Sequence, residues 1–233
     1  MILLLAALFL CATSAHDAGC DEAPAPGDDG LCAWDPSAPP RAPPATILAL
    51  SGSLRRLSSN SALARAAAEA SPSVQLAPLR LDELPFFDAD VEAAGLPHPV
   101  AELREAAFAA SGFFFATPEY NGVTSAALKN ALDWLSRSGP EGASPLKGKP
   151  YAVVSAGGGS GGARAQASID TIAGTSGMVR VGGGAPVAVK LFDGVARFDE
   201  ETGDLVDAEV RAAVGALVEE LEGAAQRFAA AAA

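Results

Sequence analysis

One uninterrupted apolar run, Phe113–Ala116, constrains the fold of this chain more than any other stretch. Polar and apolar residues do not alternate in it, so a strand here must be buried on both faces. Such strands lie in the middle of parallel sheets. Pro118 has no N–H group for a central ladder and therefore ends the predicted strand. The run thus indicates an α/β fold built on a parallel sheet.

The segment that follows the strand, Thr117–Gly122, carries a carboxylate, a phenol and an amide. Its final Asn-Gly pair predicts a turn. A helix is expected over Val123–Arg137, with Thr124 or Ser125 as its cap. Ligands of open α/β sheets bind at the carboxyl ends of the strands, so this segment is a candidate for one wall of a ligand site.

Strands and helices alternate five times from about Ala45 onwards. The patterns predict strands at 46–50, 74–79, 113–116, 151–155 and 178–189, and helices at 58–70, 99–110, 123–137, 163–173 and 207–230. The acidic stretch 82–95 has no clear period and is expected to be irregular. This alternation predicts a three-layer α/β/α sandwich with a five-stranded parallel sheet. Right-handed crossovers leave few topologies, and among them we expect the strand order 2-1-3-4-5.

Residues 1–44 differ from the rest. Within the leader, residues 1–15, the apolar stretch Ile2–Leu10 is followed by small residues where a signal peptidase could cut. It resembles a secretory signal without the usual basic residues, and it is too short to span a membrane. We expect entry into the secretory route, to a secreted, lumenal or organellar destination. A cytoplasmic location is the alternative. Residues 16–44, rich in Pro, Ala and Asp, are expected to be a disordered tail or linker before a domain at 45–233.

Charge and rare residues exclude several functions. The net charge of −12 argues against a nucleic-acid partner and against docking on an anionic membrane. The three cysteines, Cys11, Cys20 and Cys32, precede the domain, which excludes thiol catalysis and a cysteine metal site within it. Cys20 and Cys32 form a disulfide in an oxidising compartment or stay free. His16 and His98 are the only histidines, so we expect neither a histidine triad nor a metal site. No membrane-spanning segment is expected in the mature chain.

Three loops, 51–60, 117–122 and 155–162, follow strands that are neighbours in the expected order. The first combines hydroxyl groups and Arg55 with a helix N-terminus, where backbone N–H groups and the helix dipole favour a phosphate. Ordinary capping by Ser58, Ser59 and Asn60 is the alternative. In the second loop, Glu119 is either a general base or a cap for the following helix.

The third loop satisfies the dinucleotide fingerprint G-x-G-x-x-G with Gly157, Gly159 and Gly162. That fingerprint also requires an acidic residue about twenty positions further on, and 177–184 offers none. The loop also follows the fourth predicted strand instead of the first. A pliable loop that a flat ligand or a second subunit can approach closely is the better interpretation.

Two of these loops carry a family resemblance. Gly52–Arg55 with Ser58 and Asn60 resembles the G-S-x-R-x-x-S-x-N loop of the NADPH-dependent FMN reductase family. Thr117–Asn121, followed by Leu128–Trp134, resembles that family's P-E-Y-N…L-K-N-A-x-D-W signature. The chain looks closest to the bacterial chromate and quinone reductases of the family, and the related azoreductases are also similar.

The resemblance implies a flavodoxin-like fold that binds FMN non-covalently and assembles as a homodimer or homotetramer. By position it assigns the FMN phosphate to Ser53, Arg55, Ser58 and Asn60, and the isoalloxazine ring to Pro118, Glu119, Tyr120, Asn121, Ser155 and Gly158. The helix after Asn121 would form part of a dimer interface. The glycine-rich segment 181–184 departs from the family pattern.

The resemblance also implies a ping-pong oxidoreductase. NADPH or NADH reduces FMN, which then passes two electrons to a small-molecule acceptor: a quinone, or else chromate, an azo compound or free flavin. Because the flavin carries the chemistry, no catalytic side chain is predicted. The alternative is a flavodoxin-type electron carrier that needs a redox partner protein. The net charge suits such a carrier, but Arg55 does not, because carriers use a Thr/Gly-rich phosphate loop. A catalytically silent scaffold or sensor is a third reading.

Overall fold

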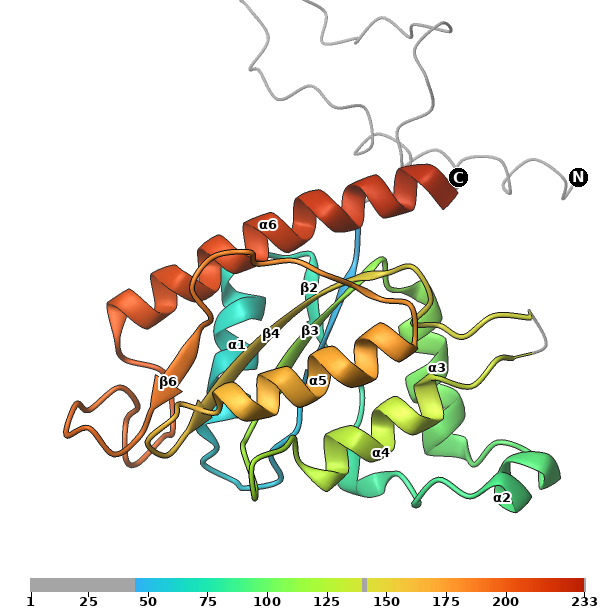
Figure 1. The fold of residues 1–233 in the computed structure, drawn as a ribbon, viewed down its shortest axis with the longest axis horizontal. Coiled ribbons are helices and arrows are strands. Elements are labelled where there is room, and N and C mark those ends of the chain that lie inside the picture. The colour runs from blue at the N-terminus through green and yellow to red at the C-terminus, as the bar shows by residue number, and fades with distance from the viewer. Residues whose placement is uncertain (1–44, 140–141, 233) are drawn as a thin grey trace, which may run out of the picture. The chain divides into compact units, whose positions relative to one another are not determined.

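The computed structural model describes residues 45–139 and 142–232, so the predicted leader and tail lie outside the described residues. The described part forms three layers, a parallel sheet between two layers of helices (Figure 1). Its strands are β1 Ile47–Ser51, β2 Val74–Leu76, β3 Gly112–Thr117, β4 Pro150–Gly157, β5 Val179–Arg180 and β6 Ala188–Lys190.

All strand pairs are parallel, and the sheet order is β2-β1-β3-β4-β5, as predicted. The fifth position differs from the prediction of one strand over 178–189. There β5 pairs with the first two residues of β4, and β6 pairs with its last three. Between them the chain leaves the sheet at Gly182, whose φ of +86° is a left-handed conformation that glycine adopts without strain. A glycine-rich stretch therefore divides the last strand in two.

The helices lie close to their predicted positions. They are α1 Ser59–Ala70, α3 His98–Ala109, α4 Ala126–Leu135, α5 Ala163–Thr175 and α6 Ala208–Ala232. The stretch expected to be irregular contains a 3-10 turn, Leu81–Glu83, and the short helix α2 Ala89–Ala94. Helices α1 and α6 cover one face of the sheet, and α3, α4 and α5 cover the other (Figure 1). Within the described residues, no helix has both the length and the apolar character that crossing a membrane requires.

The apolar run that suggested a central strand is fully buried in β3. Phe113 and Phe115 face the core beneath α3 and α4, with ring centroids 5.8 Å apart. Phe114 faces the opposite core, against α1 and α6. One strand therefore supplies large side chains to both cores, which explains why it carries no polar alternation.

Truncation of Phe114 tests this arrangement. We expect Phe114→Ala to lower the free energy of unfolding by about 3–5 kcal/mol, because the ring is buried and leaves a cavity. Chemical denaturation followed by circular dichroism measures the change. Phe86→Ala is the control, since that side chain is 80% exposed and should cost no more than about 0.5 kcal/mol. Equal losses in the two variants would contradict the assignment of β3 to the core.

Candidate functional site

The carboxyl ends of β1, β3 and β4 lie side by side, with Ser51 beside Ala116 and Thr117 beside Ser155. The three loops that follow therefore meet at one edge of the sheet. The Gly52 N–H donates to the Ala116 carbonyl at 2.8 Å, and the Ser125 hydroxyl donates to the Gly52 carbonyl at 2.6 Å. A Cβ on Gly52 would stand 2.7 Å from the Ser125 Oγ, so this junction requires glycine. The first two loops are thus locked together.

The β1–α1 loop presents free backbone donors at the N-terminus of a helix. Ser58 is the cap of α1, because its hydroxyl accepts a hydrogen bond from the Ser61 N–H at 3.2 Å. The backbone N–H groups of 54–60 make no hydrogen bond to any other described residue. Unpaired N–H groups and the positive end of the helix dipole together favour an anion. Capping and anion binding, the two alternatives for this loop, are therefore compatible.

The side chain of Asn60, a residue that the resemblance places at the phosphate, is bonded within the protein. Its buried amide donates to the Ala156 carbonyl at 3.0 Å and accepts from the Ala156 N–H at 2.8 Å. These two bonds join the first turn of α1 to β4. The side chain of Asn60 therefore holds α1 against β4, and only its backbone N–H is left to bind a phosphate.

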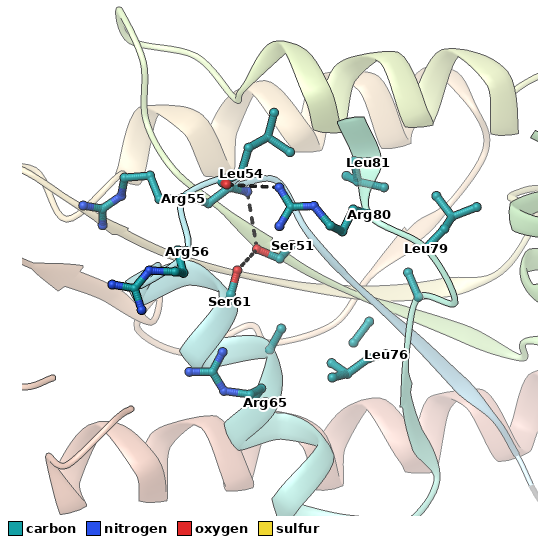
Figure 2. Close-up of a pocket in the computed structure, with 14 residues that line it drawn as sticks. Ser51, Leu54, Arg55, Arg56, Ser61, Arg65, Leu76, Leu79, Arg80 and Leu81 are labelled. Carbon is teal, nitrogen blue, oxygen red and sulfur yellow. Dashed lines mark hydrogen bonds between the residues drawn. The ribbon is translucent and has the colours of Figure 1, made fainter. Parts of the chain in front are cut away.

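Arginine side chains surround the same loop. A small cavity of about 280 Å³ opens between β1, α1 and the segment after β2, with Arg55, Arg56, Arg65 and Arg80 around it (Figure 2). Arg65 and Arg80 each pair with an aspartate. Arg55 and Arg56 are exposed and form no ion pair with the described residues. Four of the sixteen basic residues of an acidic chain thus gather here, and they make this edge locally positive.

Only Arg55 of these four was singled out from the sequence. Arg80 reaches the loop because the segment after β2 passes beside it, and it donates to the Leu54 carbonyl at 3.3 Å (Figure 2). Since this contact joins residues 26 positions apart, no local signal indicates it.

The turn predicted from the Asn-Gly pair is present. Tyr120 and Val123 exchange two backbone hydrogen bonds, at 3.0 and 3.2 Å. Asn121 and Gly122 between them have φ values of +53° and +85°. Asn-Gly is favoured where both central residues of a turn need positive φ. Buried Pro118 precedes this turn, and Tyr120 stands half-exposed at its start.

Glu119 caps a helix, but not the one that follows it. Its carboxylate accepts from the Arg164 Nε at 2.8 Å, from the Arg164 backbone N–H at 3.2 Å and from the Ser160 hydroxyl at 3.0 Å. It therefore caps α5. Burial opposes ionisation of Glu119, yet the hydrogen bonds and charge of Arg164 and the bond from Ser160 outweigh it, so its pKa is lowered. An ionised, paired carboxylate is a poor general base.

The side chain of Ser155 in β4 holds the glycine loop that follows this strand. This fully buried hydroxyl donates to the Gly161 carbonyl at 2.7 Å and accepts from the Gln166 Nε2 at 2.9 Å. Gly162 has a φ of +91°, and a Cβ there would stand 2.6 Å from the Ser155 Cβ. Close packing therefore accounts for two of the three fingerprint glycines, Gly157 and Gly162, whereas a Cβ on Gly159 would meet nothing within 4 Å. Ser155, which the resemblance places at the isoalloxazine ring, has its hydroxyl bonded to this loop and to Gln166.

A groove of about 660 Å³ runs between the second and third loops. This volume is typical of small-molecule sites. Several of its walls are glycines, which let a flat ligand approach the backbone. The residues that line it are Glu119, Asn121, Gly122, Gly158, Gly159, Ser160, Arg164 and Phe192. Phe192 was not predicted, because it arrives from the segment after β6.

Comparisons with known proteins agree with this arrangement. Residues 45–192 match the model of the NADPH-dependent FMN reductase family. The chain belongs to this family. It is 38% identical, over 171 residues, to a probable NADPH:quinone oxidoreductase of Oryza sativa subsp. japonica, a match that covers 71% of this chain and 84% of the relative.

Two solved structures are similar to the fold. FerB, a flavoenzyme NAD(P)H:(acceptor) oxidoreductase from Paracoccus denitrificans, superposes with a TM-score of 0.64 at 25% identity, over 77% of this chain and 98% of FerB. An archaeal flavodoxin superposes with a TM-score of 0.50 at 16% identity, over 78% of this chain and 99% of the flavodoxin, which shows the fold alone. The flavodoxin-like fold and the family are confirmed. With the family come the predicted enzyme class, an NAD(P)H-dependent FMN reductase, and its cofactor, FMN.

Removal of the Asn60 side chain tests whether its hydrogen bonds to Ala156 hold α1 to β4. We expect Asn60→Ala to lower the free energy of unfolding by about 2–4 kcal/mol, because the buried N–H and carbonyl of Ala156 lose their partners. Chemical denaturation measures this. Gln75→Ala is the control, since it removes an exposed amide and should cost no more than about 0.5 kcal/mol. A loss as small as the control's would show that Asn60 does not hold α1 to β4.

Proposed function

We propose that this protein is an FMN-dependent NAD(P)H oxidoreductase that passes two electrons to quinones by a ping-pong mechanism. The observation that carries the proposal is the set of hydrogen-bond donors on the β1–α1 loop. Backbone N–H groups and two arginines that have no partner among the described residues lie there, at the edge of the sheet that also holds the groove.

The residues of the first loop fit the phosphate of FMN. Arg55 offers a guanidinium that no carboxylate occupies among the described residues, and Ser53 offers a hydroxyl. Ser58 and Asn60 contribute through the backbone N–H groups of the first turn of α1, since their side chains are engaged within the protein. A doubly charged phosphate gains from each of these donors.

The other two loops fit the flavin ring. Asn121 and Gly122 of the second loop and Gly158 of the third line the groove, and Pro118 and Tyr120 precede Asn121 in the second loop. Glu119 bonds both Ser160 and Arg164, so it sets the distance between these loops. We therefore assign Glu119 a positioning role and no part in proton transfer.

When bound, FMN would supply the redox chemistry that links NAD(P)H to the acceptor. The three loops would hold the cofactor, and the groove would admit the substrates. If the two substrates use this groove in turn, the first product leaves before the acceptor enters, as a ping-pong mechanism requires. We propose quinones as acceptors because the rice relative carries that name. Free flavin is likewise reduced by one two-electron transfer, whereas an azo compound needs two such transfers for cleavage and chromate needs three electrons to reach Cr(III).

Assembly and location are further parts of the proposal. A second hollow of about 650 Å³ lies between α4 and α5, lined by apolar side chains that include Val123 and Ile172. An apolar surface beside the flavin groove supports a homodimer or homotetramer that uses α4. We retain entry into the secretory route as the proposed location, with the cytoplasm as the alternative.

An FMN-binding electron carrier is the second candidate function, favoured by the net charge of −12. An anaerobic titration separates the two. We expect NADPH or NADH alone to bleach the flavin absorbance of the FMN-loaded protein, and a quinone added afterwards to restore it. A flavin spectrum that changes only when a reductase protein is added would indicate the carrier.

Phosphate recognition is tested with FMN and riboflavin, which differ only in the phosphate. We expect Arg55→Ala to raise the Kd for FMN about 10- to 100-fold, the effect of losing hydrogen bonds to a charged group, and to leave the Kd for riboflavin unchanged. Fluorescence titration of the apoprotein measures both constants. Arg137→Ala, which removes an exposed arginine paired with Glu92, is the matched control. Equal effects on the two ligands would place Arg55 away from the phosphate.

The role of Glu119 is tested with Glu119→Gln, which keeps most of the hydrogen bonds. We expect kcat to change by no more than about threefold, whereas removal of a general base costs about 10²- to 10⁴-fold. Because the pKa of Glu119 is lowered, its contacts are complete above the usual carboxyl range and are lost only as the pH falls through the lowered value. The pH–rate profiles of both proteins should coincide between about pH 5 and 9. A pH-dependent fall in rate that occurs only in the wild type would indicate that Glu119 acts as a general base.

A further inference from the structure

Phe192 stands in solvent beside the groove. Its side chain is 85% exposed, although it is large and apolar. Scattered exposed apolar residues are common and need no explanation. Phe192, however, lines the same groove as Glu119, Asn121 and Gly158. An aromatic ring therefore faces the space that the substrates of the proposed enzyme must enter.

The sheet fixes the position of this ring. Strand β6 pairs with the end of β4, and the Leu191 N–H donates to the Gly157 carbonyl at 2.9 Å. Phe192 follows immediately after this last bond. A Cβ built on Gly158 would stand 3.5 Å from the Phe192 ring, an ordinary van der Waals contact. The ring thus lies against the glycine that the family resemblance places beside the flavin, and the rest of its surface remains open.

An ion pair between Asp193 and Arg197 joins the two ends of the segment that follows Phe192. Arg197 donates to both oxygens of Asp193, at 2.6 and 2.9 Å, and also to the Lys190 carbonyl at 3.0 Å. These bonds join the two sides of the turn that carries the ring. The hydrogen bond from Arg197 lowers the pKa of Asp193 to about 2, so the pair stays ionised at neutral pH. Phe192 is therefore presented by an ordered turn.

We propose that Phe192 forms an aromatic subsite that binds the planar ring of a quinone-type acceptor in the groove. The inference rests on the proposed function and narrows its substrate class. A flat aromatic ring gains dispersion and quadrupole interactions against Phe192. A small hydrated oxyanion such as chromate gains nothing from such a wall. Among the candidate acceptors, the subsite therefore favours planar aromatic molecules, quinones among them, over chromate.

The test uses Phe192→Ala, Phe192→Tyr and Val195→Ala in the FMN-loaded protein. Val195 is a matched control because it is half-exposed on the same turn and does not line the groove. Oxidised protein is titrated with 2-methyl-1,4-naphthoquinone in the absence of NAD(P)H, and quenching of flavin fluorescence gives the Kd. Steady-state rates with the naphthoquinone and with ferricyanide, an inorganic acceptor without a ring, give the two KM values.

We expect Phe192→Ala to raise the Kd and KM for the naphthoquinone about tenfold and to leave the KM for ferricyanide within about twofold. Phe192→Tyr should restore naphthoquinone binding, and Val195→Ala should resemble the wild type. Parallel changes for both acceptors, an effect confined to the KM for NADPH, or no effect at all would overturn the proposal. A changed oligomeric state on size-exclusion chromatography would also overturn it, because Phe192 would then belong to an interface between copies.

Failure of the subsite and failure of the proposed function are distinguishable. If the wild type binds the naphthoquinone in a Phe192-dependent way but never reduces it, the function is wrong and the subsite stands. If turnover is normal and independent of Phe192, the function stands and the subsite is wrong.

Discussion

Parallel pairing of β1, β3 and β4 is the constraint on which the rest of this structure depends. It brings the loops after Ser51, Thr117 and Gly157 to one edge of the sheet, although they are far apart in sequence. The pairing is held by burial of β3 on both faces, where Phe113–Phe115 fill two cores. A ligand site at this edge thus follows from the packing of one apolar strand.

Most polar side chains at this edge form hydrogen bonds within the protein that hold the loops in place. Asn60 joins α1 to β4, Ser125 joins the first loop to the start of α4, and Glu119 joins the second loop to α5. What faces outward is backbone N–H, glycine and the arginines around the first loop. Such a surface suits a cofactor that brings its own chemistry, because the protein then supplies position and charge without an acid–base group.

Local features of the site were predictable from the sequence. The Ser58 cap, the Asn-Gly turn and the central strand each depend on residues that are neighbours in the chain. Long-range contacts were not. The Asn60–Ala156 clamp spans 96 positions and the Glu119–Arg164 pair spans 45, so neither leaves a local pattern. The last strand is divided at Gly182, and its positive φ is not visible in the pattern of apolar residues. Phe192 lines the groove because it follows β6, the second of the two pieces.

We expect this chain to oxidise NAD(P)H at its own flavin without a partner protein. Initial rates of NADPH oxidation by the purified FMN-loaded protein, measured over a grid of NADPH and quinone concentrations, test it most directly. We expect steady turnover with parallel lines in double-reciprocal plots, the signature of a ping-pong mechanism with two separate half-reactions. Oxidation that is absent until a separate redox protein is added would contradict the account.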